Sequence, residues 1–147
     1  MLAPSILGLS HVSLSVRNRT AARDFWVDVM GFDLVADEED YCFVFDRGAG
    51  LAVVLTSHDD QVADAFDERR TGLDHLAYAV PDVESLTSWQ QRLEGMGVPH
   101  SPIAETDAGH HLNLRAPDDL PLELFVMKPE FATLLGVDPA SPVAGIG

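Results

Sequence analysis

Apolar and polar residues alternate in two short segments that lie about half a chain apart. Residues 9–16 read Leu-Ser-His-Val-Ser-Leu-Ser-Val, and residues 73–80 read Leu-Asp-His-Leu-Ala-Tyr-Ala-Val. Because a period of two places successive side chains on opposite faces of a strand, each segment is predicted to be a strand with one apolar face. A histidine is the third residue of both, which indicates an internal repeat.

A segment with helical periodicity follows each of these strands. In residues 21–30 the apolar side chains fall on one stripe, with Asn18 or Thr20 available as the N-cap. In residues 83–96 the same spacing recurs, and Asp82 is the expected N-cap. Both patterns end in Met-Gly followed by an apolar residue, at Gly31 and Gly97. Glycine is favoured directly after a helix, so two helices with matching ends are predicted.

Each predicted helix is followed by a segment with the pattern of a hairpin. Residues 41–55 have turn residues at 48–50, and residues 110–124 have turn residues at 117–119. When the two segments are laid end to end, Val54 falls opposite Glu123. The second half of the chain therefore repeats the element order of the first.

This order predicts an α+β fold, in which two βαβββ modules form one domain. The modules span about residues 5–57 and 71–127, and the charged segment that joins them is expected to hold a short helix. The tail, residues 128–147, is expected to be mobile at its end. Three apolar residues in the tail are expected to dock as one helical turn: Phe131, Leu134 and Leu135.

Composition places the chain among globular proteins with a core of ordinary size. It has 147 residues, of which 46% are hydrophobic and 22% charged. A single cysteine, Cys42, excludes a disulfide framework and is expected to be inert strand packing. No apolar run approaches the roughly 20 residues that span a bilayer, and the first residues lack the basic region of a signal peptide. A cytoplasmic protein is expected.

The charge balance restricts the classes of partner. Nine Lys and Arg residues against 24 Asp and Glu residues give a formal net charge of −15. Nucleic acids and anionic membrane surfaces both require a basic footprint, so neither is an expected partner. The charge by itself identifies no partner. The acidity itself is interpreted as a well-solvated surface.

The repeat resembles the vicinal oxygen chelate superfamily. The resemblance depends on the paired modules, on His11 and His75 in equivalent strands, and on the ending Ala-Pro-Asp-Asp-Leu-Pro-Leu-Glu-Leu-Phe at 116–125. That superfamily includes glyoxalase I, fosfomycin-resistance proteins, extradiol dioxygenases and bleomycin-binding proteins. It implies that each module folds into a cupped sheet and that two cups enclose a site.

Alternation predicts which side chains share a face with the two histidines. His11 points with Ser13, and His75 points with Ala77, while the bulky residues point toward the helices. Glu123 alternates with buried leucines on the last strand. Small neighbours leave space beside the histidines, so Ser13 and Ala77 are candidate substrate contacts.

The resemblance implies that metal ligands come from the first and last strand of each module. His11, His75 and Glu123 match three of these positions, and Val54 occupies the fourth, where it cannot bind metal. Two imidazoles and a carboxylate suit one divalent ion of Fe, Mn, Co, Ni or Zn, with positions open for water or substrate oxygens. The alternative is a member of the superfamily that keeps these residues and binds no metal.

Four further residues are weaker candidates. His110 and His111 begin a strand, and alternation allows only one of them to face the cavity, for an acid–base or supporting role. Asn113 and Arg115 are candidate substrate contacts. The competing interpretations are a solvated hairpin for the histidines and a cross-strand ion pair with an acid for Arg115.

Two specific chemistries are disfavoured by departures from the patterns of their families. The extradiol dioxygenase frame is present, but Asn113 and Asp119 replace its tyrosine and glycine, and its catalytic histidine is missing near residues 104–106. Fosfomycin-resistance proteins need a cationic pocket, and only Arg115 and Lys128 lie near the last ligand strands.

The expected function is therefore a metal-dependent enzyme, a glyoxalase-like lyase or isomerase, that chelates oxygens of a small organic substrate. A second hypothesis is a bleomycin-type resistance protein, which sequesters a drug without catalysis and is typically acidic. A dioxygenase-like enzyme or a fosfomycin-resistance-like transferase ranks third. A homodimer is expected, and the sequence leaves open whether the site lies within one chain or is shared across the dimer.

Overall fold

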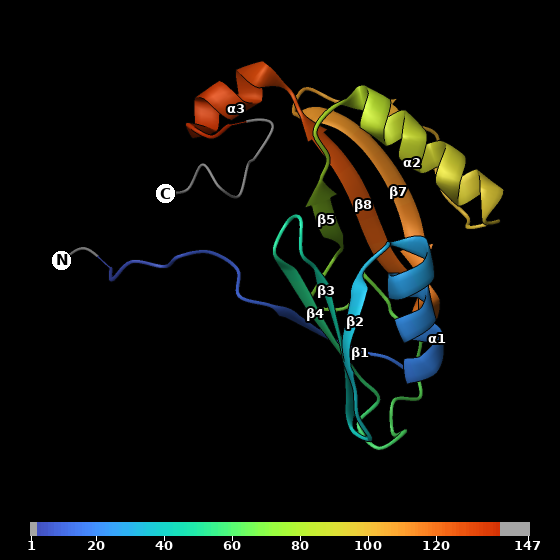
Figure 1. The fold of residues 1–147 in the computed structure, drawn as a ribbon. Helices are drawn as coiled ribbons and strands as arrows, with labels where there is room; N and C mark the ends of the chain where they lie inside the picture. Colours follow the sequence, from blue (N-terminus) through green and yellow to red (C-terminus); the bar gives the residue numbers. More distant parts are fainter. Residues whose placement is uncertain (1–2, 139–147) are drawn as a thin grey trace. The chain divides into compact units, whose positions relative to one another are not determined.

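Each of the two predicted modules forms its own four-stranded mixed sheet (Figure 1). The computed structural model describes residues 3–138. By its contacts the chain divides into two compact units, and each is described by itself. The first unit comprises residues 10–75 and 115–121, and the second comprises residues 76–114 and 122–138 with residues 3–9. The predicted α+β fold of two βαβββ modules is confirmed.

The first sheet has the strand order β1-β4-β3-β2. The β1–β4 pair is parallel, and the remaining neighbours are antiparallel. A helical segment, α1 and the π-helical turn η1, connects β1 to β2. The bounds of these elements are β1 Val12–Ser15, α1 Arg19–Asp24, η1 Phe25–Val29, β2 Asp33–Asp37, β3 Tyr41–Asp46 and β4 Leu51–Thr56.

The second sheet repeats this plan, with the strand order β5-β8-β7-β6. The β5–β8 pair is parallel, and β6 pairs antiparallel with β7. The bounds of its elements are β5 Leu76–Ala79, α2 Val83–Gly95, β6 Ala104–Glu105, β7 Gly109–Ala116, the 3-10 turn η2 Pro117–Asp119, β8 Leu120–Met127 and α3 Pro129–Leu135. Both hairpin turns lie where the sequence predicts them.

The registers of the two parallel pairs establish which positions correspond. Ser13 pairs with Val54 in the first sheet, and Ala77 pairs with Glu123 in the second. Val54 and Glu123 are thus equivalent positions of the repeat, as the alignment of the two hairpins predicts.

Strands β1 and β5 both begin three residues later than the alternation predicts, so each histidine lies just before its strand instead of within it. β1 begins at Val12 and β5 begins at Leu76, so His11 and His75 each precede the first paired residue. The alternation of faces nevertheless holds, because both histidines are exposed whereas Leu14 is buried. We call the face that holds the exposed or half-buried side chains the open face of each sheet.

The opposite face of each sheet supplies the apolar core of its unit. In the first unit, Trp26 is 1% exposed and packs edge-on against Phe25 and Phe32. In the second unit, Leu86 and Leu93 of α2 are fully buried. Buried strand residues alternate with open-face residues, namely Cys42, Val44, Val53 and Leu55 in the first sheet and Leu112, Leu114, Leu122 and Leu124 in the second. The predicted burial of Cys42 is correct, and burial raises the pKa of its thiol.

The first helix is less regular than its sequence pattern predicts. Asn18 is its N-cap and accepts a hydrogen bond from the backbone N–H of Ala21. After Asp24 the helix widens to a π-helical turn, in which the N–H of Met30 donates to the carbonyl of Phe25. A single-sequence period of 3.6 does not distinguish such a turn from an α-helix.

Other expectations require correction. The joining segment contains turns but no helix among its residues 57–75. In α3, Ala132 is buried whereas Leu134 and Leu135 are exposed, so the predicted docking of these two leucines is wrong. Residues 139–147, where the mobile end is expected, lie outside the described residues.

On the second helix, Asp82 is the N-cap as predicted.

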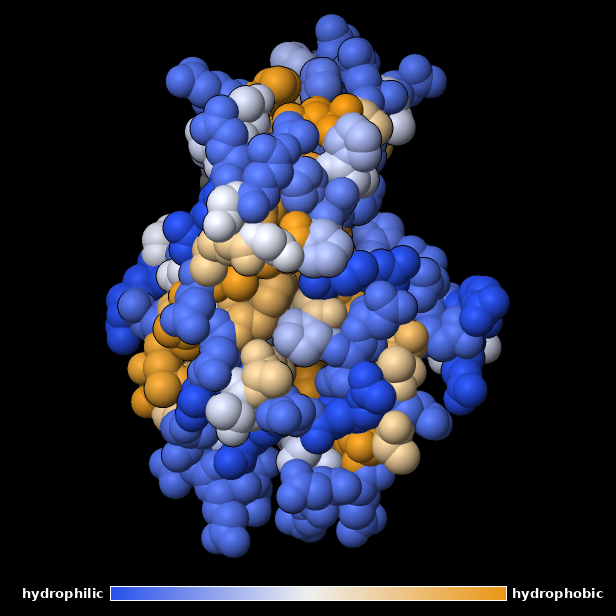
Figure 2. Space-filling model, turned by 90° about the vertical axis from the view of Figure 1, so that its right-hand side faces the viewer, coloured by the Kyte–Doolittle hydropathy of each residue, from blue (hydrophilic) through white to orange (hydrophobic). Residues whose placement is uncertain are grey.

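Hydrophilic side chains cover most of the side of the molecule that Figure 2 shows, with smaller apolar patches between them. This agrees with the interpretation of the acidic residues as a solvated surface. None of the helices described between residues 3 and 138 has the length and apolar character to cross a membrane.

The tip of the β7–β8 hairpin belongs to the first unit by its contacts. Asp118 adopts a left-handed conformation with φ of 66°. Its carboxylate accepts hydrogen bonds from the backbone N–H of Arg17 at 2.8 Å and from the Arg17 side chain at 2.5 Å. Its carbonyl accepts the N–H of Phe66 at 2.8 Å. Residue 118 is therefore joined to two other segments of the first unit.

Replacing Leu122 with alanine is expected to lower the free energy of unfolding by about 2–5 kcal/mol, because it leaves a cavity in the core. Leu122 is 1% exposed, whereas Leu134 is 78% exposed. The matched variant Leu134→Ala is expected to change stability by about 0.5 kcal/mol or less. Urea unfolding followed by circular dichroism measures both values, and equal losses would contradict the assignment of the core.

Candidate functional site

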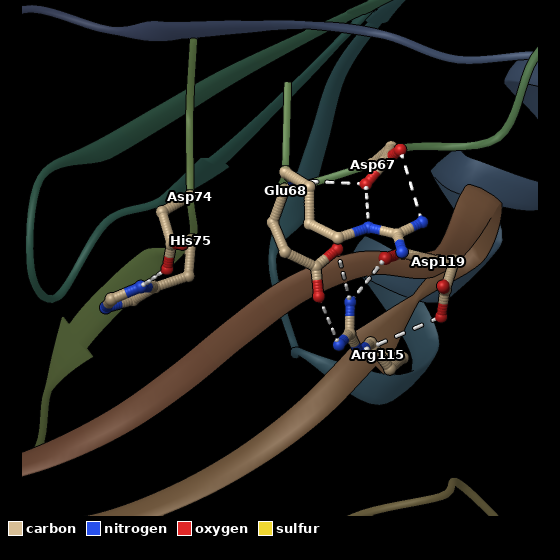
Figure 3. A network of polar contacts seen from close by, with 7 residues as sticks. Asp67, Glu68, Asp74, His75, Arg115 and Asp119 are labelled. Carbon is tan, nitrogen blue, oxygen red and sulfur yellow. Dashed lines mark hydrogen bonds and ion pairs between the residues drawn. The ribbon is translucent and has the colours of Figure 1, made fainter. Parts of the chain in front are cut away.

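Both repeat histidines contact the residue that precedes them through the same ring nitrogen. Nδ1 of His11 lies 3.1 Å from the Ser10 hydroxyl, and Nδ1 of His75 lies 2.6 Å from Oδ1 of Asp74 (Figure 3). A carboxylate can only accept, so Nδ1 of His75 donates and Nε2 holds the lone pair. This is the arrangement in which second partners orient metal-binding imidazoles.

An apolar hollow of about 500 Å³ adjoins His11 on the open face of the first sheet. Val54 and Phe43, which are paired in the register of β3 and β4, line this hollow because both side chains point to the open face. The remaining lining residues are Ser10, Tyr41 and Ala52. Where the second sheet has the Glu123 carboxylate, the first sheet thus has an apolar surface.

On the open face of the second sheet, the carboxylate of Glu123 lies beside His111. Oε1 of Glu123 is 3.2 Å from Nδ1 of His111, and the two side chains are 15% and 19% exposed. Nε2 of His111 lies 2.7 Å from the Thr106 hydroxyl. The His111 ring also packs at 4.9 Å from that of Phe125. The imidazole is thereby held on both nitrogens and on one face.

His110 points to the opposite face of β7. Its Nε2 lies 3.8 Å from Glu105, whose carboxylate is paired with the Lys128 ammonium at 2.6 Å. That ion pair lowers the pKa of Glu105. Of the two adjacent candidates, only His111 shares a face with Glu123.

Arg115 pairs with acids, as the competing interpretation predicts, but these acids lie in the joining segment and in the hairpin turn instead of across a strand. Its guanidinium lies 2.9 Å from Glu68 of the joining segment and donates to the carbonyl of Asp119 at 3.0 Å (Figure 3). The hydrogen bond from Arg115 lowers the pKa of Glu68. Asn113 is exposed, and its backbone N–H donates to the Ser101 hydroxyl at 3.0 Å. Ser13 and Ala77 are exposed on the open faces of their sheets.

The chemistry of the predicted donors fits a divalent ion, since two imidazoles and a carboxylate all occupy open faces. Within residues 3–138, however, no group of three or more His, Cys, Asp or Glu side chains is arranged to hold a metal ion. The pair that the structure does bring together is His111 and Glu123.

Sequence reasoning assigned no role to Thr106 or Phe125, which hold the His111 ring. The register of the short β6–β7 pair, with Ala104 opposite His111, places Thr106 next to the ring only once the strands are paired. A two-residue strand leaves no readable alternation, so no signal in the sequence identifies this contact.

Comparison with protein families gives a match over most of the chain. Residues 8–124 match the model of the Glyoxalase/Bleomycin resistance protein/Dioxygenase superfamily. A comparison with curated proteins found no match.

Solved structures with the same fold include an antibiotic binding protein and a fosfomycin resistance protein. A glyoxylase/bleomycin resistance protein/dioxygenase domain from Frankia sp. EAN1pec is 30% identical, with a TM-score of 0.77 over 84% of this chain and 100% of that chain. TnmS3, an antibiotic binding protein from Streptomyces sp. CB03234, is 25% identical, with a TM-score of 0.65 over 87% of this chain and 100% of that chain. The fosfomycin resistance protein FosX from Listeria monocytogenes, complexed with Mn(II) and sulfate, is 19% identical, with a TM-score of 0.68 over 89% and 99%.

Replacing Glu68 with glutamine is expected to destabilise the protein at pH 7 and to have little effect in acid. Arg115 lowers the pKa of Glu68 in the folded state. The stabilisation is therefore present above the usual glutamate pKa of about 4.3 and is lost as the pH falls through the lowered value. Urea unfolding at pH 7 and pH 3 measures the difference. Glu39→Gln, on the loop before β3, is the control, and an equal effect at both pH values would contradict this ion pair.

Proposed function

Because this chain belongs to the glyoxalase/bleomycin resistance protein/dioxygenase superfamily, we propose that it is a metal-dependent enzyme of the glyoxalase-like type. His11, His75 and Glu123 are the proposed ligands of one divalent ion. The proposed reaction is a lyase or isomerase reaction on a small organic substrate with two chelating oxygens. When bound, such an ion supplies a Lewis acid that stabilises negative charge on those oxygens.

The observation that supports this proposal most directly is the matching contact of the two histidines. In both halves of the repeat, Nδ1 is engaged by the side chain of the preceding residue. A core histidine satisfied by its own packing would be buried, whereas both of these are exposed. Ser10 and Asp74 thus support the rings from equivalent positions.

Other residues of the chain are proposed to contact the substrate or to support the metal ligands. Val54 replaces the donor at the fourth repeat position, so the first sheet contributes an apolar surface rather than a second carboxylate. Ser13 and Ala77 leave room on the open faces for a substrate. Asn113 is a proposed substrate contact, whereas the ion pair with Glu68 occupies Arg115. His111, which faces Glu123, is the candidate for an acid–base or supporting role.

A second candidate function is a drug-binding module without catalysis. The apolar hollow beside His11 favours it, and so does the likeness to an antibiotic binding protein at 25% identity. The net charge of −15 suits a cationic ligand. The two functions differ in their need for metal, which a single binding measurement separates.

The proposal includes a homodimer in the cytoplasm. An isologous pair is the commonest assembly of small soluble proteins. The lone cysteine, Cys42, is compatible with a reducing compartment. Light scattering coupled to gel filtration tests the assembly, and a monomer at micromolar concentration would contradict it.

Replacing His75 with alanine is expected to abolish tight Mn(II) binding and to leave the fold intact, because one of three ligands is lost. His58→Ala is the matched control, since His58 is also exposed but contacts Ser15 rather than the proposed donors. Titration with Mn(II), followed by the electron paramagnetic resonance signal of the free ion, measures affinity and stoichiometry. Stoichiometric binding with unchanged affinity in His75→Ala would refute the ligand assignment.

Replacing Phe43 with alanine tests the drug-binding alternative in metal-free protein. Loss of an aromatic contact worth about 0.5–1.5 kcal/mol is expected to weaken the binding of bleomycin about two- to tenfold. Phe45→Ala is the control, because Phe45 lies on the same strand but outside the lining of the hollow. Equilibrium dialysis measures the affinity, and no binding to the unmutated protein would exclude bleomycin as its ligand.

A further inference from the structure

We propose that His111 is a positioning residue, which holds the carboxylate of Glu123, and that Thr106 fixes the orientation of the His111 ring. This inference rests on the proposed function, in which Glu123 is a metal ligand. It assigns a role to a side chain that neither the repeat nor the alternation of the strands singles out over its neighbour His110.

The contacts of His111 account for both of its ring nitrogens. Oε1 of Glu123 lies 3.2 Å from Nδ1, and the Thr106 hydroxyl lies 2.7 Å from Nε2. A carboxylate only accepts, so the contact with Glu123 is favourable when the proton is on Nδ1. Nε2 then accepts the Thr106 hydroxyl proton, for which the carbonyl of Gly109, at 3.4 Å, is the more distant acceptor. The ring thus has one tautomer and one orientation.

This tautomer separates His111 from the proposed ligands. His75 keeps its lone pair on Nε2 because its donating nitrogen faces Asp74. In His111 the corresponding nitrogen is occupied by Thr106. His111 is therefore suited to orient Glu123 through the contact of its Nδ1, which is the usual role of groups that surround metal-binding carboxylates.

The backbone of the turn between β6 and β7 places Thr106 beside the His111 ring. The N–H of Thr106 donates to the carbonyl of Gly109 at 2.8 Å, which closes the turn between β6 and β7. A Cβ on Gly109 would lie 2.0 Å from the carbonyl oxygen of Val126, so only glycine allows β7 to start this close to β8. The Phe125 ring packs against His111 from β8. Two strands and one turn therefore fix the same imidazole.

Three variants and a matched control test the positioning role. His111→Leu removes the imidazole that contacts the Glu123 carboxylate and is expected to weaken Mn(II) binding about 10–100-fold. His111→Asn places an amide N–H where Nδ1 was and is expected to restore most of the affinity. Thr106→Val removes the hydroxyl and is expected to give an intermediate loss. His110→Leu, on the opposite face of β7, is expected to bind Mn(II) like the unmutated protein.

The size of the loss distinguishes a positioning residue from a ligand. Complete loss of Mn(II) binding in both His111 variants would show that the ring itself binds the ion, and unchanged affinity in His111→Leu would show that it does not position Glu123. Either result overturns the inference. The absorption spectrum of bound Co(II) reports the coordination number of the ion. This number is expected to be unchanged in His111→Leu, whereas the loss of a ligand would lower it.

A measurement on metal-free protein separates this inference from the proposed function. The carboxyl ¹³C resonance of Glu123 is expected to shift in His111→Leu and in Thr106→Val but not in His110→Leu. No shift would refute the contact, whatever the metal affinity. If the resonance shifts as expected but the unmutated protein binds no Mn(II), the contact stands and the proposed function fails.

Discussion

The parallel pairing of the first and last strand of each module determines which face the side chains of these strands occupy. In both sheets this pair brings together segments that are far apart in the sequence, β1 with β4 and β5 with β8. Partners in register project to the same face, so one shift of register would turn Glu123 and its neighbours into the core. Buried leucines on the alternate positions oppose such a shift, because it would expose them. The apolar core thus fixes the chemistry of the open face.

The two open faces have diverged although their backbones repeat. The first has Val54 and Phe43 around an apolar hollow, whereas the second has Glu123 and His111 in contact. A repeat whose halves differ in this way can divide ligand recognition between an apolar surface and a polar one. This division is compatible with an enzyme and with a binding module, since both need apolar contact and orientation.

The sequence predicts the modules, the helix caps and the equivalence of Val54 and Glu123, because each depends on a local period or a capping residue. It does not predict the π-helical turn after Asp24, because the spacing of the apolar residues there also fits an α-helix. Nor does it predict that Glu123 meets His111, because this depends on the pairing of β7 with β8 and on a turn at Gly109. The candidate residues were thus predictable individually, and their contacts were not.

The hydrogen bonds between Arg17 and Asp118 affect how the protein folds during its synthesis. These two residues are 101 positions apart in the chain, yet they belong to the same compact unit. Closing so large a loop has an entropic cost, and contacts of long sequence separation slow folding. When the first sheet leaves the ribosome, its partner at residue 118 has not yet been made. The first unit therefore remains incomplete until residue 118 has emerged. Until then, its exposed apolar surface is open to chaperones and to aggregation.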